Sequence, residues 1–334
     1  MSRPRLVVCA GQDLFKSFFS TPQTKRLSKL FQWKLESAND IAGLKKSLSN
    51  AEALVTTWDS PKFNEDIKQL APHLRVITHC GGEVKSRFSA SLFEELTITN
   101  AAEPMARATA EMGAALLIYS ARNIDHYRDA LRRRSNRIYQ DLHLHGNSES
   151  VIGREVAMIG FGRIGRALIE LTRGFELRWL VHDPYASKDA AKNQTVRFVD
   201  LETLLPKAHL LVLTAALTDE TRGLLGRARL AQLPDGAVVI NIARGGLIDL
   251  AALTKEVRSK RLRCAVDVTD PQEPLPINHP LRTLPGAIVT PHIAASNLRV
   301  REQIADTVLD DLESFFAGRE VKNRVTVAML ARMT

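Results

Sequence analysis

The sequence has 334 residues, of which 45% are hydrophobic and 25% charged, and its formal net charge is +9. This length exceeds what one hydrophobic core normally supports and predicts two domains. No apolar run approaches the roughly 20 residues that a bilayer span needs, and the N-terminus leads directly into an apolar strand, so we expect a cytoplasmic protein without a membrane partner. The three cysteines, Cys9, Cys80 and Cys264, lack the spacing of a disulfide framework or a metal site.

The excess of positive charge raises the question of a nucleic-acid partner. The densest basic run, Arg132 to Arg134 with Arg137, follows a helical pattern and lacks the interleaved aromatic residues of a single-strand binding surface. We interpret this run as a solvated helix end and expect no nucleic-acid partner. The charge then favours anionic cofactors and substrates.

The first hundred residues alternate short apolar runs with polar helical stretches, which predicts a parallel sheet flanked by helices. The expected strands are residues 6–10, 53–57, 74–78 and 96–99. Residues 101–134 then predict one long, largely buried helix after Pro104. Its apolar positions at helical spacing are Met105, Ala108, Met112, Ala115, Leu116 and Tyr119.

A second alternating series begins after the polar stretch 146–150 and predicts a nucleotide-binding sheet. Its expected strands are residues 155–159, 179–182, 210–213, 237–241, 264–268 and 287–290. The helical period returns over 297–318. The chain shows no short-period repeat and no low-complexity tract.

A dinucleotide site is predicted where the strand at 155–159 meets Gly160-Phe161-Gly162-Arg163-Ile164-Gly165. In this pattern Gly160 permits the tight turn, Gly162 lets the backbone approach a pyrophosphate, and Gly165 lets helix and strand pack closely. Asp183 ends the next strand, where a carboxylate reaches the adenosine ribose hydroxyls and repels a 2′-phosphate. NAD is therefore expected as the cofactor, in preference to NADP.

Three more segments place reactive groups just beyond predicted strand ends, the edge that faces the ligand crevice of an open α/β sheet. They begin at Asn241, Asp267 and Thr290. Arg244 offers a planar fork that binds a carboxylate bidentately. His292 has the near-neutral pKa that reversible proton transfer needs, and a neighbouring carboxylate such as Glu273 would stabilise its cation.

With its glycine turn, N-x-A-R-G, D-V followed by E-P, and T-P-H, the chain resembles the D-isomer-specific 2-hydroxyacid dehydrogenase family. The resemblance implies that Arg244 anchors the carboxylate and polarises the carbonyl, that Glu273 orients His292, and that His292 transfers the proton. The residues then expected to bind NAD are Gly160, Gly162, Arg163, Ile164, Gly165, Asp183, Thr214, Ile242, Ala243 and Asp267. For Asp267 a loop-closing role is an equal alternative, and Asp270 is an alternative partner for His292.

The resemblance also implies the architecture, an α/β fold of two Rossmann-like, doubly wound parallel-sheet domains with the active-site cleft between them. The substrate domain would comprise residues 1–101 and 296–334, and the NAD domain 102–295. Substrate-carboxylate binding would fall to Cys80, Gly81 and Gly82, and a homodimer would form through residues 122–150.

Two positions depart from the family pattern. Glu83 stands where the second glycine of the substrate loop is expected, and Thr214-Ala215-Ala216 replaces a more usual H-x-P. The chain is predicted to interconvert a small 2-oxo acid and its D-2-hydroxy acid with NAD, without a metal. The alternative raised by Glu83 is a non-catalytic NADH sensor on the same fold.

Overall fold

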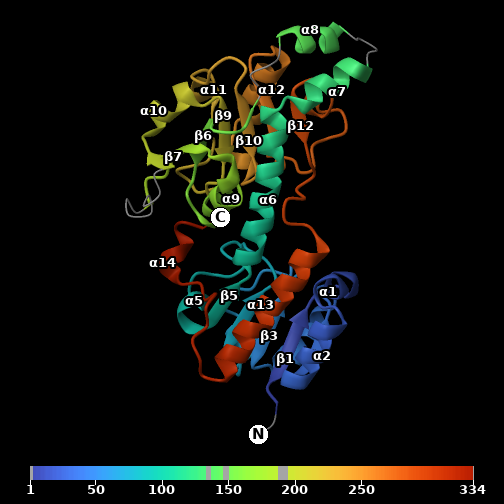
Figure 1. The fold of residues 1–334 in the computed structure, drawn as a ribbon. Coiled ribbons are helices and arrows are strands. Elements are labelled where there is room, and N and C mark those ends of the chain that lie inside the picture. Colours follow the sequence, from blue (N-terminus) through green and yellow to red (C-terminus); the bar gives the residue numbers. More distant parts are fainter. Residues whose placement is uncertain (1–2, 133–136, 146–149, 187–194, 334) are drawn as a thin grey trace. The chain divides into compact units, whose positions relative to one another are not determined.

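The computed structural model describes residues 3–132, 137–145, 150–186 and 195–333, drawn as a ribbon in Figure 1. The chain divides into two compact units, one of residues 1–105 with 295–334 and the other of residues 106–294. The predicted stretch 146–149, Arg133 and Arg134 lie outside the described residues. Each unit is built on its own parallel sheet, and the α/β class with two such sheets is as predicted.

The first unit contains a five-stranded parallel sheet in the order β2-β1-β3-β4-β5. The strands are β1 (Arg5–Cys9), β2 (Gln32–Glu36), β3 (Ala53–Thr56), β4 (Val76–His79) and β5 (Thr97–Asn100). The helices are α1 (Gln12–Phe18), α2 (Thr21–Leu30), α3 (Ile41–Leu48), α4 (Ile67–Leu70), α5 (Leu92–Glu95), α13 (Leu298–Phe316) and α14 (Val327–Leu330). The central strands are buried on both faces, which explains why they read as unbroken apolar runs.

The second unit contains a seven-stranded parallel sheet in the order β12-β11-β10-β9-β6-β7-β8. Its strands are β6 (Glu155–Ile159), β7 (Arg178–His182), β8 (Val196–Phe198), β9 (Leu210–Leu213), β10 (Val238–Asn241), β11 (Arg263–Val266) and β12 (Ala287–Val289). Its helices are α6 (Ala102–Ala121), which begins in the first unit, α7 (Ile124–Arg132), α8 (Arg137–His145), α9 (Arg163–Leu171), α10 (Leu201–Leu204), α11 (Arg227–Leu230) and α12 (Leu250–Arg258).

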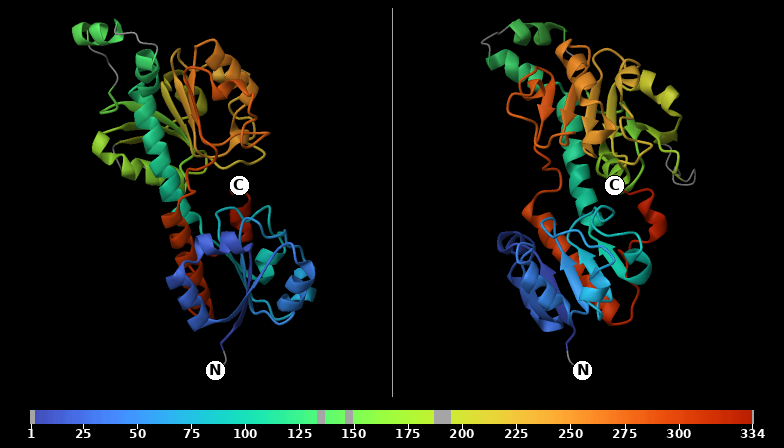
Figure 2. Two further views of the ribbon diagram at one scale, coloured as in Figure 1. Left: turned by 90° about the vertical axis from the view of Figure 1, so that its right-hand side faces the viewer. Right: turned by 180° about the vertical axis from the view of Figure 1, so that it is seen from behind.

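Helices cover both faces of the seven-stranded sheet, as Figure 2 shows. Val156 and Met158 of β6 pack in a core with residues of α6 and α9, while Ala157 and Ile159 pack in a second core with residues of α10 and α12. Alternate residues of one strand thus enter different cores. The order of the strands reverses between β6 and β9, and this switch point is where such sheets bind nucleotides.

Two strands were not predicted, β2 and β8, and both lie at the edges of their sheets. The five residues of β2 are all exposed or half-buried, and β8 has only three residues. An edge strand packs against one neighbour and retains polar side chains, so neither stretch shows an apolar run.

The predicted single helix over 101–134 is wrong in its length, because α6 ends at Ala121. Asn123 adopts a left-handed backbone conformation with φ of 50°, which separates α6 from α7. The buried face of α6 is also shifted, since Ala115 is exposed while Ala110, Gly113 and Leu117 are buried. A Cβ atom on Gly113 would lie 2.6 Å from Cδ1 of Ile242, so this glycine lets α6 pack closely on the sheet.

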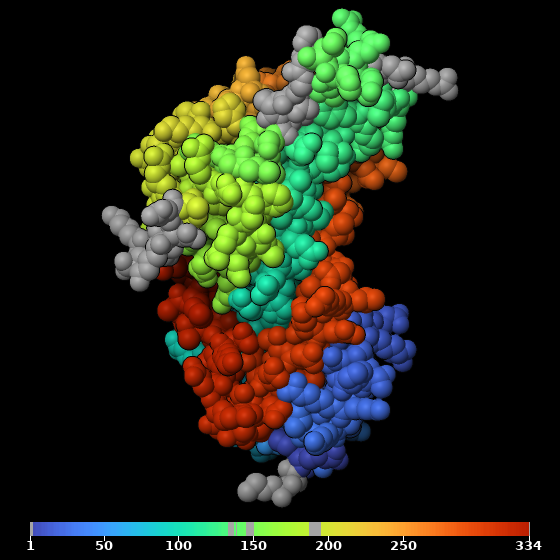
Figure 3. All heavy atoms as spheres, viewed as in Figure 1, coloured from blue at the N-terminus to red at the C-terminus, as the bar shows by residue number. Residues whose placement is uncertain are grey.

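Helix α13 packs on β4 and β5 of the five-stranded sheet and lies beside α1 and α2. Figure 3 shows the orange surface of α13 next to the blue N-terminal segment. The side chain of Asn297 caps the helix by accepting a hydrogen bond from the amide of Val300. Asp306 and Asp310 on α13 bind Gln23 and Arg26 of α2. The segment after Ala295 therefore completes the first unit, although it is far from the rest of it in sequence.

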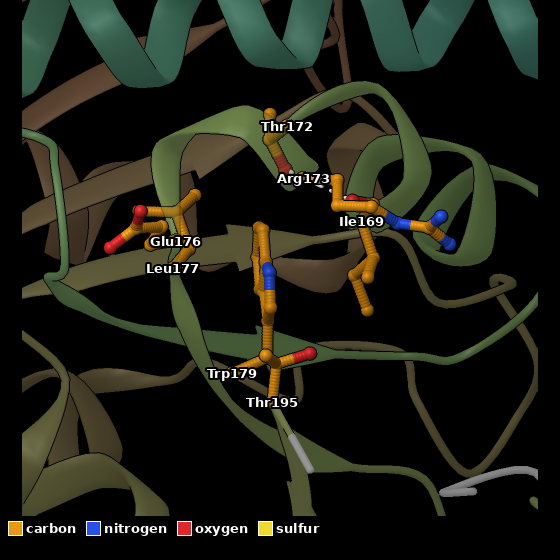
Figure 4. A pocket seen from close by; sticks show the side chains of 7 residues that line it. All are labelled: Ile169, Thr172, Arg173, Glu176, Leu177, Trp179 and Thr195. Atoms are coloured by element: carbon orange, nitrogen blue, oxygen red, sulfur yellow. Dashed lines mark hydrogen bonds between the residues drawn. The ribbon is translucent and has the colours of Figure 1, made fainter. Parts of the chain in front are cut away.

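The described residues include no helix that is long and apolar enough to cross a membrane. Figure 4 shows a hollow in the second unit beside Trp179, near the amino end of β7. The predicted cofactor-binding and catalytic residues follow the carboxyl ends of the strands, so this hollow lies at the opposite edge of the sheet and contributes none of them.

The buried imidazole of His79 makes the first unit sensitive to acid. His79 Nδ1 lies 2.9 Å from Oγ1 of Thr56 on the neighbouring strand. Burial, with a smaller contribution from the charge of Arg87, lowers the pKa of His79 to about 3. The unfolded chain binds this proton near pH 6.5 and the folded chain does not, so stability is complete above that pH and falls as the pH decreases toward 3.

We expect His79→Asn, whose amide can still bond Thr56, to flatten the dependence of unfolding free energy on pH between about pH 6 and pH 4. The slope of unfolding free energy against pH should decrease by up to about 1.4 kcal/mol per pH unit, the value for one proton. Urea unfolding at several pH values measures it, with His73→Asn as the control because His73 is exposed. Equal slopes in the wild type and His79→Asn would contradict the assignment.

Candidate active site

The glycine turn after β6 is held by close backbone contacts. Gly160 has φ of 97°, and a Cβ atom there would lie 2.4 Å from the amide nitrogen of Ala215. A Cβ on Gly165 would lie 2.8 Å from the carbonyl oxygen of Gly160, so the first turn of α9 packs directly on the turn. No atom lies within 4 Å of a Cβ built on Gly162. The turn is therefore closed on its protein side and open at Gly162, where a phosphate needs room.

Helix α9 begins at Arg163, with Gly162 as its N-cap residue. The amides of a first helical turn have no partner within the helix, and the helix dipole adds partial positive charge there. This combination suits the pyrophosphate of a dinucleotide. The residues of the turn thus fit the predicted cofactor.

Asp183 and Thr214 both stabilise this turn. The Asp183 carboxylate accepts hydrogen bonds from the amides of Phe161, at 2.7 Å, and Tyr185, at 2.9 Å. Each carboxylate oxygen can accept a second bond, so capacity for ribose hydroxyls remains. Thr214 is buried and donates its hydroxyl proton to the carbonyl oxygen of Gly160 at 2.6 Å.

The segment after β10 is organised by Asn241, a residue whose role was not predicted. Its buried side chain accepts from the amide of Ala243 at 3.1 Å and donates to the carbonyl oxygen of Arg244 at 2.9 Å. Ile242 and Ala243 are buried, and Arg244 is partly buried. The Arg244 guanidinium donates to the carbonyl oxygen of Ala243 at 2.8 Å. The accepted bond at position i+2 is typical of an Asx turn, a signal that could have been found in the sequence.

A chain of contacts joins the segments that carry Arg244, Glu273 and His292. A Cβ atom on Gly245 would lie 2.1 Å from the carbonyl carbon of Thr269, so these two backbones touch. Thr269 donates its amide proton to Oε1 of Glu273 at 3.0 Å. Oε2 of Glu273 lies 2.7 Å from Nδ1 of His292. Three loops that follow neighbouring strands are thereby brought together.

The pairing leaves Nε2 of His292 available for proton transfer, because the carboxylate holds the proton on Nδ1. The His292 side chain is 49% exposed and that of Glu273 is 34% exposed, so both are reachable from solvent. Asp270, the alternative partner, is an exposed residue and Glu273 receives the bond instead.

The side chain of Asp267 anchors the loop that carries His292. Asp267 is 1% exposed, and its carboxylate accepts hydrogen bonds from the hydroxyl of Thr290 and the amides of Ile293 and Ala294. Its backbone carbonyl accepts from the amide of His292 at 2.8 Å. His292 has φ of 55°, a strained conformation for a residue with a side chain, and these bonds maintain it. The loop-closing contacts of Asp267 are therefore present, and its contact with a cofactor stays a prediction.

The substrate loop predicted at Cys80, Gly81 and Gly82 lies in the first unit, after β4. Cys80 is buried, and burial raises the pKa of its thiol far above the ordinary range, so it is an uncharged packing residue. In the described part of the chain, the amides of Gly82 and Glu83 donate to no acceptor. The Glu83 carboxylate instead accepts from the amide and hydroxyl of Ser86, at 2.7 Å each. Glu83 therefore retains an available amide while its charge caps the following turn.

Within the described residues no group of histidine, cysteine and carboxylate side chains could hold a metal ion. The polar side chains that these contacts bring to the sheet edge of the glycine turn include Arg244, Glu273 and His292. Residues 114–294, more than half of the chain, match the family model described as D-isomer specific 2-hydroxyacid dehydrogenase, NAD binding domain. The chain belongs to the D-isomer specific 2-hydroxyacid dehydrogenase family. The family predicted from the sequence is thus confirmed.

Relatives in this family have two lengths. A glyoxylate reductase of Thermococcus kodakarensis is 30% identical, over 82% of this chain and 83% of that protein. A D-3-phosphoglycerate dehydrogenase of Archaeoglobus fulgidus is 29% identical over 83% of this chain, and the chain spans only about half (51%) of that protein. A D-isomer specific 2-hydroxyacid dehydrogenase from Xanthobacter autotrophicus, solved in complex with NADPH and MES, has the same fold with a TM-score of 0.77. The two sequences are 22% identical, and the match covers 99% of this chain and 100% of that chain.

We expect Gly245→Ala to destabilise the second unit, because the added Cβ would meet backbone atoms of Thr269 that cannot move without displacing Glu273. The expected loss of unfolding free energy is about 2 to 4 kcal/mol by denaturant titration. Gly174→Ala is the control, since nothing lies within 4 Å of a Cβ there. A Gly245→Ala protein as stable as the control would show that the two loops do not touch.

Proposed function

We propose that this chain is an NAD-dependent dehydrogenase that interconverts a small 2-oxo acid and its D-2-hydroxy acid. The observation that carries the proposal is the 2.7 Å pairing of His292 with Glu273, linked through Thr269 to the Arg244 segment. All of these residues follow strands whose carboxyl ends lie at the same sheet edge as the glycine turn. An oriented imidazole and a guanidinium beside a dinucleotide are what such a reaction requires.

In the reducing direction, protonated His292 donates the proton on Nε2 to the carbonyl oxygen of the substrate. Glu273 accepts a hydrogen bond from Nδ1 and stabilises the imidazolium before the transfer. Arg244 binds the substrate carboxylate and polarises the carbonyl. NADH, when bound, supplies the hydride that the carbonyl carbon receives. In the oxidising direction His292 takes the hydroxyl proton.

NAD is the proposed cofactor because Asp183 stands at the end of β7, one strand from the glycine turn. A carboxylate there binds two ribose hydroxyls and repels a 2′-phosphate. The relative from Xanthobacter autotrophicus was solved with NADPH, so the choice between the cofactors within this family is a matter for experiment.

The available amides of Gly82 and Glu83 support the proposed substrate loop in the first unit. The alternative of a non-catalytic NADH sensor arose from the charge of Glu83. Since that carboxylate binds Ser86 and leaves the amide available, no observation favours the sensor.

A homodimer through residues 122–150 remains part of the proposal. In the described part of this stretch, Leu131 is 59% exposed, Tyr139 is 64% exposed and Leu144 is 76% exposed. Large apolar side chains at the surface are the feature that a subunit interface would cover.

We expect Arg244→Ala and His292→Gln each to lower kcat/KM for 2-oxo acid reduction by at least about 10²-fold, because each removes a group that acts on the reacting atoms. NADH binding should change little, which fluorescence titration measures. His209→Gln is the control, as this exposed histidine precedes β9 at the other edge of the sheet. Full turnover by either active-site variant would refute its assigned role.

We expect the wild type to bind NADH roughly 10²-fold more tightly than NADPH, and Asp183→Asn to narrow this preference at least tenfold, since the variant lacks the repelling charge. Titration of both cofactors measures the ratio. The control is Asp235→Asn, because the Asp235 carboxylate is 88% exposed and precedes β10 at the distant edge. Equal affinity of the wild type for the two cofactors would overturn the assignment of NAD.

A further inference from the structure

Trp58, Arg301 and Phe18 form a stacked cluster in the first unit. The Arg301 guanidinium lies 5.3 Å from the centre of the Trp58 ring and 5.6 Å from that of Phe18. The two rings meet edge to face, with centres 5.1 Å apart. Phe18 is fully buried, whereas Trp58 and Arg301 are partly buried. The aromatic faces therefore hold the guanidinium in place but leave its N–H edge able to bind an acceptor.

The cation of Arg301 has no carboxylate partner among the residues that the structure describes. Arg87 donates to the backbone carbonyl oxygens of Thr57 and Trp58 at 3.2 Å each. The Nε of Arg87 is buried and donates to no acceptor in the described part of the chain. Two guanidinium groups thus contact Trp58, and neither forms an ion pair with any residue that the structure describes.

The acidic groups next to this cluster in the chain accept hydrogen bonds from neutral donors. Asp59, next to Trp58, accepts from the amide of Gly11 and the hydroxyl of Thr57. Glu83, four residues before Arg87, accepts both of its bonds from Ser86. Among the described residues neither carboxylate forms an ion pair with Arg87 or Arg301, and a partly buried cation gains from an anionic partner.

The cluster adjoins the proposed substrate loop. A Cβ atom on Gly81 would lie 2.9 Å from the indole nitrogen of Trp58, so this ring reaches the loop directly. The available amides of Gly82 and Glu83 follow at once in the chain. Trp58 therefore contacts both this loop and the guanidinium of Arg301.

We propose that Arg301, stacked on Trp58 and supported by the charge of Arg87, binds a second anionic group at the far end of the substrate. The preferred substrates are then 2-oxo acids that carry a further carboxylate or phosphate. This inference rests on the proposed dehydrogenase function and deepens it by naming the substrate class. Arg301 is a specificity residue in this proposal and takes no part in proton or hydride transfer.

The test compares pairs of substrates that differ in the distal charge. The pairs are 2-oxoglutarate with 2-oxopentanoate, oxaloacetate with 2-oxobutanoate, and 3-phosphohydroxypyruvate with hydroxypyruvate. NADH oxidation by the wild type should give a kcat/KM at least tenfold higher for the charged member of one or more pairs. The first two pairs test a carboxylate and the third tests a phosphate.

Arg301→Met keeps the length and apolar stacking of the side chain and removes its charge. We expect it to lower kcat/KM about 10²-fold for the charged substrate, through KM, and less than threefold for its uncharged partner. Arg301→Lys keeps the charge without the planar fork. Its kcat/KM for the charged substrate should lie between those of the wild type and of Arg301→Met. Arg299→Met is the matched control, because Arg299 is exposed on the same turn of α13 and should leave both values unchanged.

A wild type that reduces both members of every pair equally well overturns the inference, whether or not the variants fold. So does an equal loss for both members in Arg301→Met, which would indicate a purely structural stack. If no 2-oxo acid is reduced at all, the proposed function fails instead. The inference is then judged by binding, since quenching of tryptophan fluorescence by 2-oxoglutarate or 3-phosphohydroxypyruvate should be present in the wild type and lost in Arg301→Met.

Discussion

The buried carboxylate of Asp267 is the constraint on which the candidate active site depends. It follows β11, accepts hydrogen bonds from Thr290, Ile293 and Ala294, and so ties the loop after β12 to the neighbouring strand. Leaving this buried carboxylate without some of these partners would cost free energy of folding, so the hydrogen bonds favour the loop conformation in which all of them form. His292 keeps its left-handed backbone conformation within this arrangement and meets Glu273 there.

The remaining site geometry follows from close backbone approach at a few glycines. Gly245 brings the segment of Arg244 against Thr269, and Gly165 brings α9 against the turn at Gly160. At Gly245 the missing side chain lets the loops of two adjacent strands touch, and at Gly165 it lets α9 pack on the turn that precedes it. A hydrogen bond from Asn241 fixes the turn of the Arg244 segment, and one from Thr214 ties the segment after β9 to Gly160. The parallel strands end at a common edge of the sheet, and these contacts fix the positions of the loops that follow that edge.

The charged side chains discussed above have different kinds of partner in the two units. In the second unit Glu273 and Asp183 are each bonded to groups of the neighbouring loops. In the first unit Arg87 and Arg301 both contact Trp58 and form no ion pair with the described residues. Cations held by aromatic and backbone groups are a binding surface for anions, and this contrast underlies the substrate class inferred for the chain.

The sequence alone determined the family, the fold class and most of the strands, because parallel strands buried on both faces read as apolar runs and the glycine turn has a fixed spacing. It could not show the edge strands β2 and β8, the break after Ala121, or the choice of Glu273 over Asp270, since each depends on packing by distant residues. The tertiary structure alone brought Arg301 onto Trp58 and Asp267 onto the loop of His292. Local sequence patterns indicate which strand a residue follows. Side chains from different strands and helices come into contact only when the sheet has formed.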